Sequence, residues 1–371
     1  MDTLAHVPSV HEPSPRPTDY GSMSAGPASA LGAKLMAAPQ IAQSAVVVGS
    51  ASFGLGSGVA EGAVIRAPHR GVEIGSGSYV LENGVVVGTR SNPVSIGRRT
   101  TFGHRCLVIG ATVGDLCEIG NASVLMPGAR LGDRVFLGEG TVVPPGARLP
   151  SDVVAVGRPA RVIRAVSAGD LDRLLGLREG DLSVPAPSGV IVSHRQGAIT
   201  MGQLYPYRGV VPTIASTARV FPTAEITGDV VVGERSIIGA GVKIVGDSHG
   251  PVRIGDDVQI LENTVLHLLP DNDLVVDDGV TVGPGAMIHG CRIGAGSVIE
   301  PGAIVCDGSV LGPGCVVRAG AVVKQRSQFP AGTDIDGMPA VAVGHLPSPP
   351  AVPDWAWQID DLPGLGPGQQ W

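Results

Sequence analysis

Aliphatic residues recur about every six positions along two long stretches of the chain, with Gly and other small residues between them. The aliphatic series of Ile74–Val143 reappears 180 residues later as the series of Ile254–Val323. A ten-residue step (Val86–Ile96) and a five-residue step (Val108–Val113) interrupt the first series, and both interruptions recur in the second. Chance does not preserve two irregular steps in register, so the pattern indicates an internal duplication.

A period of six residues predicts a parallel β-helix, in which three short strands make one coil of about 18 residues and aliphatic side chains stack between coils. The composition agrees with this fold. Gly (55) and Pro (31) suit tight corners, and aromatic residues make up only 3% of the chain. We therefore predict an all-β protein built from two tandem hexapeptide-repeat parallel β-helices.

The pattern divides the chain into five segments. A flexible tail is predicted for residues 1–40, because they are rich in Pro, Ser, Ala and Gly and show no period. The first β-helix is predicted for residues 41–164 and the second for residues 209–345. A short capping helix and a linker occupy residues 165–208, and a second tail occupies residues 346–371.

Two of these segments carry further signals. Ser167 and Asp170 have capping-box spacing in front of a run of leucines, which predicts a helix that covers the open end of the first β-helix. The C-terminal tail contains Trp355, Trp357 and Trp371 in a chain that is poor in aromatic residues. Two interpretations remain open for this tail: a docking peptide, or a segment that packs on its own domain.

Charge and hydropathy exclude several classes of partner. The net charge of −7 and the lack of a long basic run argue against nucleic acid or an anionic membrane surface. No apolar run reaches the roughly 18 residues of a membrane-spanning helix, and the N-terminus shows no signal-peptide pattern. Five cysteines without CxxC spacing suit reduced thiols. We expect a cytoplasmic protein with a small-molecule substrate, without nucleic-acid or membrane partners.

Two histidines of the second array occupy equivalent places in adjacent coils. His267 and His289 are 22 residues apart, and the long step between them adds four residues to a coil of 18. Each follows an inward aliphatic residue, so both side chains should point outward, about 4.8 Å apart along the sheet. Two imidazoles at that spacing can bind one metal ion. The first array has Val87 and Ile109 at these places.

The first array contributes a histidine at another position. His104 lies in the corner after Phe102, where the second array has Pro284. One copy thus carries two histidines and the other carries a third. A solvated histidine ladder and an ordinary surface histidine are the alternative interpretations.

On these residues the chain resembles the gamma-class carbonic anhydrases. That family's pattern is roughly Arg-Gly-Asp, then Gln-Asp-x-x-x-x-His, then Gly-His-x-x-x-x-His-Gly-Cys. The matching segments of this chain are Val245–Asp247, Leu261–His267 and Gly283–Cys291 in the second array, and Arg66–Pro68, Leu81–Glu82 and Gly103–Ile109 in the first. The resemblance implies left-handed β-helices that assemble through their faces. It also implies a zinc or iron site with two histidines from one helix and one from its neighbour.

Carried over by position, His267 and His289 match the two metal ligands of one helix, and His104 matches the ligand of its neighbour. Arg66 matches the family arginine, and Asp247 matches the aspartate that this arginine pairs with across the interface. Arg66 and Asp247 as ordinary surface charges are the alternative. The resemblance thus predicts one composite three-histidine site between a first and a second array, within one chain or between chains of a homo-oligomer.

Two positions depart from the family pattern. The family glutamine, which orients the metal-bound solvent, is replaced by Leu81 and Leu261, and the aspartate after it by Glu82 and Glu262. Glu262 is the nearest candidate for moving protons. Both glutamates could equally be plain turn residues.

The first functional hypothesis is a zinc-dependent, carbonic anhydrase-like lyase. Three histidine ligands with an open fourth position lower the pKa of bound water from about 15.7 to about 7, and the hydroxide can attack CO2 or a related electrophilic carbon. A second hypothesis keeps this site for a hydration, hydrolysis or cyclisation step of a biosynthetic pathway. A third is an acyl-CoA-dependent hexapeptide acyltransferase with a histidine as general base, and a fourth is a non-catalytic scaffold.

Overall fold

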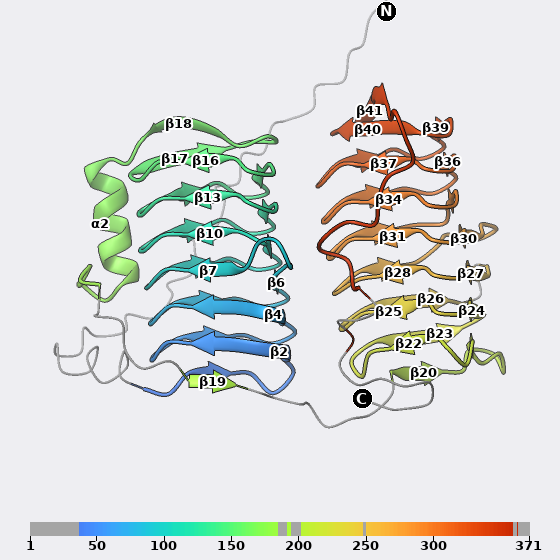
Figure 1. Ribbon diagram of the computed structural model, residues 1–371, viewed down its shortest axis with the longest axis horizontal. Helices are drawn as coiled ribbons and strands as arrows, with labels where there is room; N and C mark the ends of the chain where they lie inside the picture. The colour runs from blue at the N-terminus through green and yellow to red at the C-terminus, as the bar shows by residue number, and fades with distance from the viewer. Residues whose placement is uncertain (1–36, 185–190, 194–201, 248–249, 359–361, 363–371) are drawn as a thin grey trace, which may run out of the picture.

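The computed structural model describes residues 37–184, 191–193, 202–247, 250–358 and 362. Most of the predicted N-terminal tail, part of the linker and Trp371 lie outside these residues. Two β-helices lie side by side, and the successive coils of both advance in the same direction, from the bottom to the top of Figure 1. The predicted all-β fold, with two tandem hexapeptide-repeat β-helices and one short helix after the first, is confirmed.

Each β-helix has three faces, which the chain visits in the order face 1, face 2, face 3. In the first β-helix, face 1 holds β1 (Gln40–Ile41), β3 (Gly58–Val59), β5 (Tyr79–Val80), β8 (Thr101–Phe102), β11 (Glu118–Ile119), β14 (Phe136–Leu137) and β17 (Val153–Val156), with β18 (Arg161–Ala165) antiparallel at its end. Face 2 holds the first halves of β2 (Val46–Phe53) and β4 (Val64–Ile74), then β6 (Val85–Val87), β9 (Leu107–Ile109), β12 (Val124–Leu125) and β15 (Val142–Val143). Face 3 holds the second halves of β2 and β4, then β7 (Val94–Ile96), β10 (Thr112–Val113), β13 (Arg130–Leu131) and β16 (Arg148–Leu149), with β19 (Ile191–Ser193) antiparallel to β2.

The second β-helix repeats this plan. Face 1 holds β22 (Arg219–Val220), β25 (Ile237–Ile238), β28 (Gln259–Ile260), β31 (Thr281–Val282), β34 (Val298–Ile299), β37 (Val316–Val317) and β40 (Thr333–Gly337), with β41 (Ala340–His345) antiparallel at its end. Face 2 holds β20 (Gln203–Tyr205), β23 (Glu225–Gly228), β26 (Lys243–Gly246), β29 (Val265–Leu266), β32 (Met287–Ile288), β35 (Ile304–Val305) and β38 (Val322–Val323). Face 3 holds β21 (Thr213–Ile214), β24 (Val230–Val232), β27 (Val252–Ile254), β30 (Leu274–Val276), β33 (Arg292–Ile293), β36 (Val310–Leu311) and β39 (Gln328–Phe329).

Stacked aliphatic side chains form a separate core inside each β-helix. Parallel pairing aligns the coils, so that Leu266 pairs with Ile288 as Val86 pairs with Val108. The corners between face 1 and face 2 need a left-handed residue, and Asn83 (φ 57°) and Asn263 (φ 55°) supply it at equivalent places. Asn tolerates this conformation better than most residues with a side chain.

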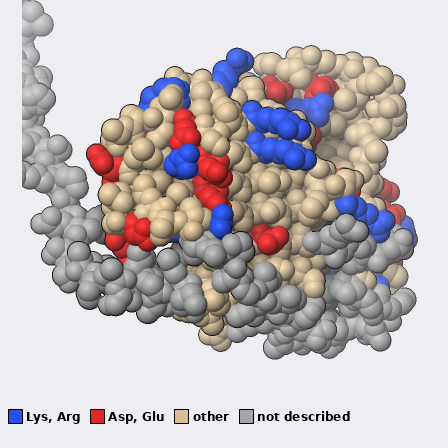
Figure 2. Space-filling view, turned by 60° about the vertical axis from the view of Figure 1, so that its left-hand side comes forward, with Lys and Arg blue, Asp and Glu red and all other residues tan. Residues whose placement is uncertain are grey.

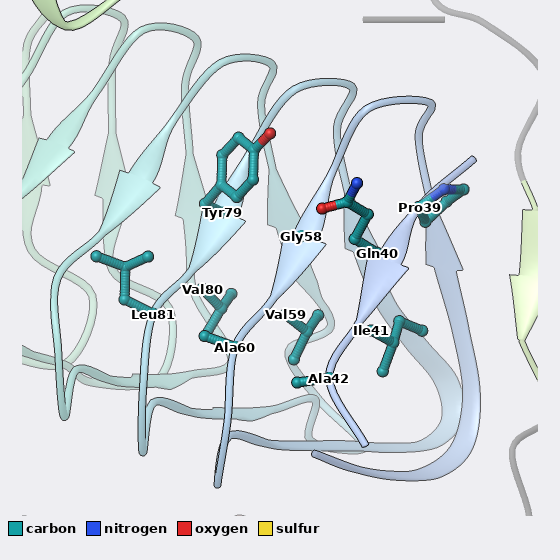
Figure 3. Close-up of a pocket in the computed structure, with 10 residues that line it drawn as sticks. All are labelled: Pro39, Gln40, Ile41, Ala42, Gly58, Val59, Ala60, Tyr79, Val80 and Leu81. Carbon is teal, nitrogen blue, oxygen red and sulfur yellow. The ribbon is translucent and has the colours of Figure 1, made fainter. Parts of the chain in front are cut away.

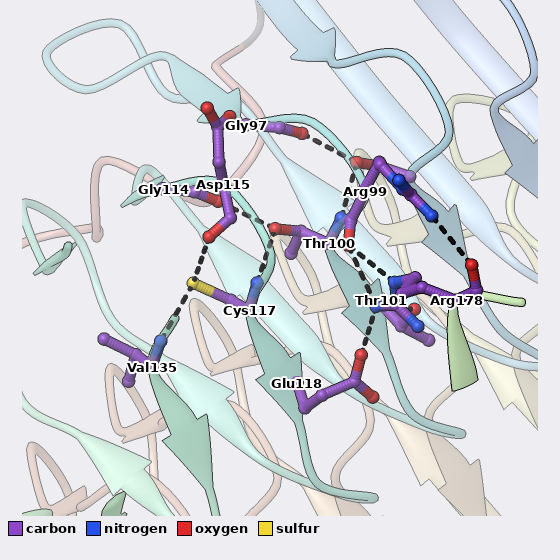
Figure 4. Close-up of polar contacts among 11 residues, drawn as sticks. Gly97, Arg99, Thr100, Thr101, Gly114, Asp115, Cys117, Glu118, Val135 and Arg178 are labelled. Atoms are coloured by element: carbon purple, nitrogen blue, oxygen red, sulfur yellow. Dashed lines mark hydrogen bonds and ion pairs between the residues drawn. The ribbon is translucent and has the colours of Figure 1, made fainter. Parts of the chain in front are cut away.

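The predicted helix forms as α2 (Ala168–Leu177), but it does not cover the open end of the first β-helix as predicted. It runs along face 1, on the side away from the second β-helix (Figure 1), and β18 pairs with the last strand of face 1 instead. Ser167 and Asp170 form the expected capping box, and Leu174 is fully buried. Just after α2, Arg178 donates to the carbonyl oxygen of Arg99 (2.9 Å) and to Thr101 Oγ1 (3.0 Å), and it also pairs with Glu118 (Figure 4). These contacts hold the helix to β8 and β11.

The two β-helices meet in an apolar seam between face 2 of the first and the face 1–face 2 corner of the second. The seam contains Val64, Val85, Val87, Leu107, Ile109, Val124, Met126 and Val142 from the first array and Phe221, Ile237, Ala240, Leu261, Val298 and Val316 from the second. Leu107 packs closely against Gly285. A Cβ atom on residue 285 would lie only 3.0 Å from the two methyl carbons of Leu107. Asn263 Nδ2 donates across the seam to the carbonyl oxygens of Gly62 (3.0 Å) and Asn83 (3.2 Å).

The C-terminal tail fills the edge of this seam. Trp355, Ala356 and Trp357 are buried there. The side-chain amide of Gln259 on β28 exchanges two hydrogen bonds with the backbone of Trp357, at 2.9 and 2.8 Å. The tail therefore packs on its own chain, which decides between the two interpretations left open for Trp355 and Trp357.

Acidic and basic side chains are interspersed on the face seen in Figure 2. Ion pairs such as Arg98–Asp115 (2.6 Å) and Arg134–Asp152 (2.5 Å) join successive corners of the first β-helix. No helix in the part of the chain that the structure describes is long and apolar enough to cross a membrane.

We predict that Trp357→Ala destabilises the protein by about 3–5 kcal/mol, because it removes a fully buried aromatic side chain from the seam. Val352→Ala is the matched control in the same tail. Val352 is 57% exposed, so its truncation should change stability by less than about 0.5 kcal/mol. Denaturant unfolding measures both. Equal effects of the two substitutions would contradict a structural role for the tail.

Candidate metal centre

His267 and His289 lie next to each other on face 2 of the second β-helix. The backbone N–H of His267 donates to Ile288 O (3.0 Å), which fixes the two residues in adjacent coils. Their ring centroids are 6.3 Å apart and the rings are nearly perpendicular, at 87°. Both residues are half-buried, so their rings line the outer surface rather than the core. This is the arrangement that the spacing of 22 residues predicted.

The carboxylate of Asp307 lies close to the His289 ring. Asp307 Oδ2 is 3.7 Å from His289 Nδ1, and Asn272 Nδ2 donates to Asp307 Oδ1 at 3.3 Å. His289 Nδ1 is buried and forms no hydrogen bond within the described residues. Asp307 gave no signal in the sequence pattern, because it occupies an ordinary turn position.

His104 lies at the face 1–face 2 corner of the first β-helix, directly after β8. Its Nδ1 is 2.7 Å from Glu82 Oε2, and both side chains are about half exposed. In the described ranges, no three His, Cys, Asp or Glu side chains converge in a way that could hold a metal ion. A single chain therefore does not assemble the predicted site from His104, His267 and His289. The composite site stays a prediction for contacts between chains.

Arg66 is buried at the end of the apolar seam. Its guanidinium pairs with Glu262 (2.8 Å), and both side chains are only 2% exposed. Arg66 Nη2 donates to the carbonyl oxygen of Trp355 (2.7 Å), and the guanidinium carbon lies 4.7 Å from the centre of the Trp357 ring. The tail and both arrays thus converge on one arginine.

This arrangement corrects two predictions. Arg66 was expected to pair with Asp247, but the structure places the carboxylate of Glu262 on its guanidinium. Glu262 was expected to move protons, but it is buried between the two arrays and held by Arg66, out of contact with solvent. Asp247 follows β26 and precedes residues 248–249, which lie outside the described residues, so its role stays a prediction.

Within the chain, the positions that correspond to the three predicted histidine ligands lie in the apolar seam and carry no histidine. Val87 and Ile109, at the positions of the histidine pair, are fully buried in the apolar cluster, and Pro284, at the position of His104, is also buried. Leu261, at the position of the family glutamine, belongs to the same cluster. The replacements follow from packing, because an unpaired polar group buried there would cost stability.

Face 1 of the first β-helix is covered by α2 over β8 and β11. Its first coils carry a hollow lined by Gly58, Tyr79 and Leu81 among others, where the Tyr79 ring packs over Gly58 (Figure 3). Leu81 therefore lies at the rim of an open surface, whereas its counterpart Leu261 is buried.

The cysteines do not suit nucleophilic or metal chemistry in the isolated chain. All five are free thiols. Burial raises the pKa of Cys106 and of Cys117 to about 12 and also raises the pKa of Cys291. These thiols are protonated at neutral pH, and the reactive form of cysteine is the thiolate.

Comparison with known proteins agrees with the hexapeptide-repeat fold. Residues 290–325 match the family described as bacterial transferase hexapeptide (six repeats), and residues 93–127 match the hexapeptide repeat of succinyl-transferase. The chain is 40% identical to a carbonic anhydrase from Geobacillus kaustophilus (strain HTA426) over 104 residues, which are 28% of this chain and 57% of that protein. It is 31% identical to the carnitine operon protein CaiE of Proteus sp. (strain LE138) over 143 residues, 38% of this chain and 72% of that protein.

Among solved structures, a hexapeptide transferase family protein from Anaplasma phagocytophilum is similar, with a TM-score of 0.38 and 31% identity over 39% of this chain and 84% of that chain. The chain belongs to the gamma-class carbonic anhydrase-like family of hexapeptide-repeat proteins. The matched stretch spans little more than half of the carbonic anhydrase and about three quarters of CaiE.

We predict that Glu262→Gln destabilises the protein by about 3–5 kcal/mol, because it leaves Arg66 charged and buried without its carboxylate. Arg66→Met with Glu262→Leu should recover most of this loss, because an apolar pair of similar volume needs no desolvated charges. Denaturant unfolding of both variants measures the coupling. A double variant no more stable than Glu262→Gln alone would contradict this interpretation of the pair.

Proposed function

We propose that this protein is a metal-dependent enzyme that activates water, with its centre between two copies of the chain. His267 and His289 of one copy and His104 of another would hold the ion. The pair of imidazoles in adjacent coils is the observation that carries the proposal. Three neutral imidazoles suit zinc, and iron is the alternative that the family allows.

The histidine pair supplies two of the three ligands that such an ion would need. Both members of the pair point outward from one face, and His289 is only 27% exposed in the isolated chain. His289 and His104 each have Nδ1 toward a carboxylate, which leaves Nε2 for another partner. The missing part is the third imidazole, which lies on the other array.

The apolar seam inside the chain is a model for a second contact, between chains, which would use face 2 of the second array in the same way. On face 2 of the second array, the outward side chains of Val265, Met287, Ile304 and Val322 are half-buried and apolar, and the Glu225–Lys243 ion pair continues the same row. Their counterparts in the first array are buried in the seam. An apolar face of this kind is typical of a surface that another subunit covers.

By duplication, the partner of this face is the face 1–face 2 corner of a first array, around Asn83 and His104, because α2 covers face 1 itself over β8 and β11. Asn83 repeats Asn263, with the same left-handed backbone, and it is exposed. We expect its amide to donate to the carbonyl oxygens of Gly241 and Asn263 of the other chain, as Asn263 does to Gly62 and Asn83 within the chain. A contact between two different surfaces repeats from chain to chain and closes into a ring when the rotation allows it.

This contact would bring His104 to the histidine pair. Inside the chain, Leu107 of β9 touches Gly285, the residue after Pro284. By duplication, Met287 of β32 would lie near Arg105, the residue after His104. Arg105, exposed in the chain, stands in place of a glycine. We expect its side chain to keep this second seam wider than the first and so to leave room for a substrate.

The chemistry then follows from the residues. A metal ion with three histidine ligands lowers the pKa of bound water from about 15.7 to about 7. The chain contributes the imidazoles and, through Val265 and Met287, an apolar wall that excludes other water. Leu81 replaces the amide that would orient the nucleophile. We infer CO2 or a related electrophilic carbon as the target, with hydration, hydrolysis or cyclisation of another small metabolite favoured over fast CO2 turnover.

An acyltransferase is the second candidate. Both family descriptions that match the repeats name transferases, and an uncharacterised transferase of Bacillus subtilis (strain 168) is 41% identical over 90 residues. In that case His104 or His289 would act as general base and no metal would be needed. Metal content separates the two candidates.

We predict one zinc ion per chain in purified protein. His289→Ala and His104→Ala should each lose it, because each removes one of three ligands. His345→Ala is the matched control, since His345 ends β41 on an exposed edge. Elemental analysis decides this. Unchanged zinc in His104→Ala would exclude the composite site, and no zinc in wild-type protein would favour the acyltransferase.

Mixing the two variants tests whether the site lies between chains. Randomly mixed rings of His104→Ala and His289→Ala chains should regain about a quarter of the zinc, because only one of four neighbour combinations has all three histidines. A mixture that regains none, while wild type binds zinc, would place the third ligand elsewhere.

We also predict slow CO2 hydration. An unoriented nucleophile costs rate even when it is present, so kcat/KM should lie at least about 100-fold below the diffusional ceiling of about 10⁸ M⁻¹s⁻¹. Leu81→Gln restores the amide and should raise the rate, whereas Leu261→Gln, buried in the seam, should only destabilise. Stopped-flow assays of zinc-loaded protein measure this. A wild-type rate near the ceiling would show that the glutamine is dispensable here.

A further inference from the structure

The hollow on face 1 of the first β-helix is an apolar surface of the first three coils. The described residues that line it belong to β1, β3 and β5 and to the corners beside these strands (Figure 3). Its volume is about 530 Å³, and Ala60, Tyr79 and Leu81 are half-buried there. An apolar surface of this kind gains free energy when an apolar segment covers it.

The same place on the second β-helix is occupied by the C-terminal tail. β22, β25 and β28 are the counterparts of β1, β3 and β5, because each set forms the first three strands of face 1 in its array. On β22 and β28, the Trp357 ring lies 5.5 Å from the Phe221 ring, and Gln259 exchanges two hydrogen bonds with the Trp357 backbone. The duplication therefore identifies the hollow as the counterpart of a surface that holds a peptide segment.

Two substitutions make the hollow deeper than its counterpart. Ala42 stands at the place of Phe221, and Gly58 stands at the place of Ile237. Phe221 and Ile237 are both buried in the apolar seam beside the tail. The first array thus lacks two large apolar side chains at this place, and a segment that brings its own apolar side chains would replace them.

The segments that follow the two closing strands differ in how far they reach. After β41 the chain runs down face 1 of the second β-helix until Trp357 meets β28 (Figure 1). After β18 the chain forms α2, and Arg99 Nη1 then donates to the carbonyl oxygen of Ser183 (2.7 Å) at the corner before β8. β19 pairs with β2 on face 3. The described part of this segment therefore leaves face 1 above the hollow.

The N-terminal residues are joined to the chain at the rim of the hollow. The carbonyl oxygen of Ala37 accepts from the N–H of Gly56 (2.7 Å), and Pro39 lines the hollow. Residues 1–36 lie outside the described residues, and their last part, Ala30–Met36, contains two leucines and a methionine. Seven residues can span about 23 Å, whereas three coils span only about 10 Å. A tethered segment also has an effective concentration in the millimolar range, so that even a weak apolar contact is populated.

We propose that Ala30–Met36 docks in the hollow of its own chain and covers β1, β3 and β5, as Trp355–Trp357 covers β22, β25 and β28. The docked segment lies over Leu81, beside the face 1–face 2 corner at Asn83 that the proposed contact between chains uses. Each array is then completed by a terminal segment of the chain. No metal ion takes part in this contact, so its failure and that of the proposed function are distinguishable.

Trypsin digestion of the full-length protein tests the contact. Docking should protect the bond between Lys34 and Leu35, which lies inside the segment. Ala60→Glu places an unpaired carboxylate in the apolar hollow, so this bond should be cut at least about 10-fold faster than in the wild type. Ala342→Glu on the exposed strand β41 is the matched control and should leave the rate unchanged.

The bonds after Arg130 and Arg148 report on global unfolding, because both residues belong to strands of the first β-helix. They should stay intact in all three proteins while the bond after Lys34 is cut. Equal cleavage after Lys34 in Ala60→Glu and the wild type would overturn the proposal.

Photo-crosslinking identifies the occupant and is independent of Ala60→Glu. Tyr79→p-benzoylphenylalanine keeps an aromatic ring in the hollow, and peptide mass spectrometry after irradiation of the full-length protein shows what the ring captures. We expect capture of Ala30–Met36, with the product migrating as a single chain on a denaturing gel. Capture of residues 363–371, capture of another chain, or no capture would overturn the proposal.

Discussion

The buried ion pair between Arg66 and Glu262 is the interaction on which the assembly of the two arrays depends. Every coil of a β-helix presents nearly the same aliphatic surface, so a seam of valines and leucines alone would tolerate a slip by one coil. A buried charge that loses its partner costs about 3–5 kcal/mol, so only one register is acceptable. Trp355 and Trp357 cover the pair and exclude water, which makes the penalty for any other register large.

Duplication explains why two similar surfaces serve different purposes. One face 2 packs within the chain, where Val87 and Ile109 take the places of ligands and the seam becomes core. The other keeps His267 and His289 and remains accessible. A metal site in the inner seam would have required buried polar groups with every hydrogen bond satisfied. Moving that requirement to a single outer seam lets the chain combine a stable scaffold with one reactive surface.

The sequence could predict those features of the fold that depend only on the six-residue period. The coil length, the duplication and the stacking of His267 on His289 all follow from counting, because pairing in a β-helix is local. The docking of the arrays depends on outward positions, and the pattern carried a signal that was missed. Strands such as Val85–Val87 and Leu107–Ile109 are apolar on both sides, which is typical of strands buried on both faces. Reading that signal would have placed the inner seam.

The partner of Arg66 shows where sequence reasoning alone stops. Asp247 and Glu262 are both carboxylates of the second array, and only the docking of two rigid bodies decides which one meets the arginine. The same holds for His104, whose distance from the histidine pair is set by an assembly and not by a period. The duplication itself supplies the missing constraint, because the inner seam shows how face 2 meets a face 1 corner. Applied to the outer surfaces, that geometry predicts that Val245, at the place of Arg66, faces Glu82 across a contact between chains, so this second contact would lack the buried ion pair of the first.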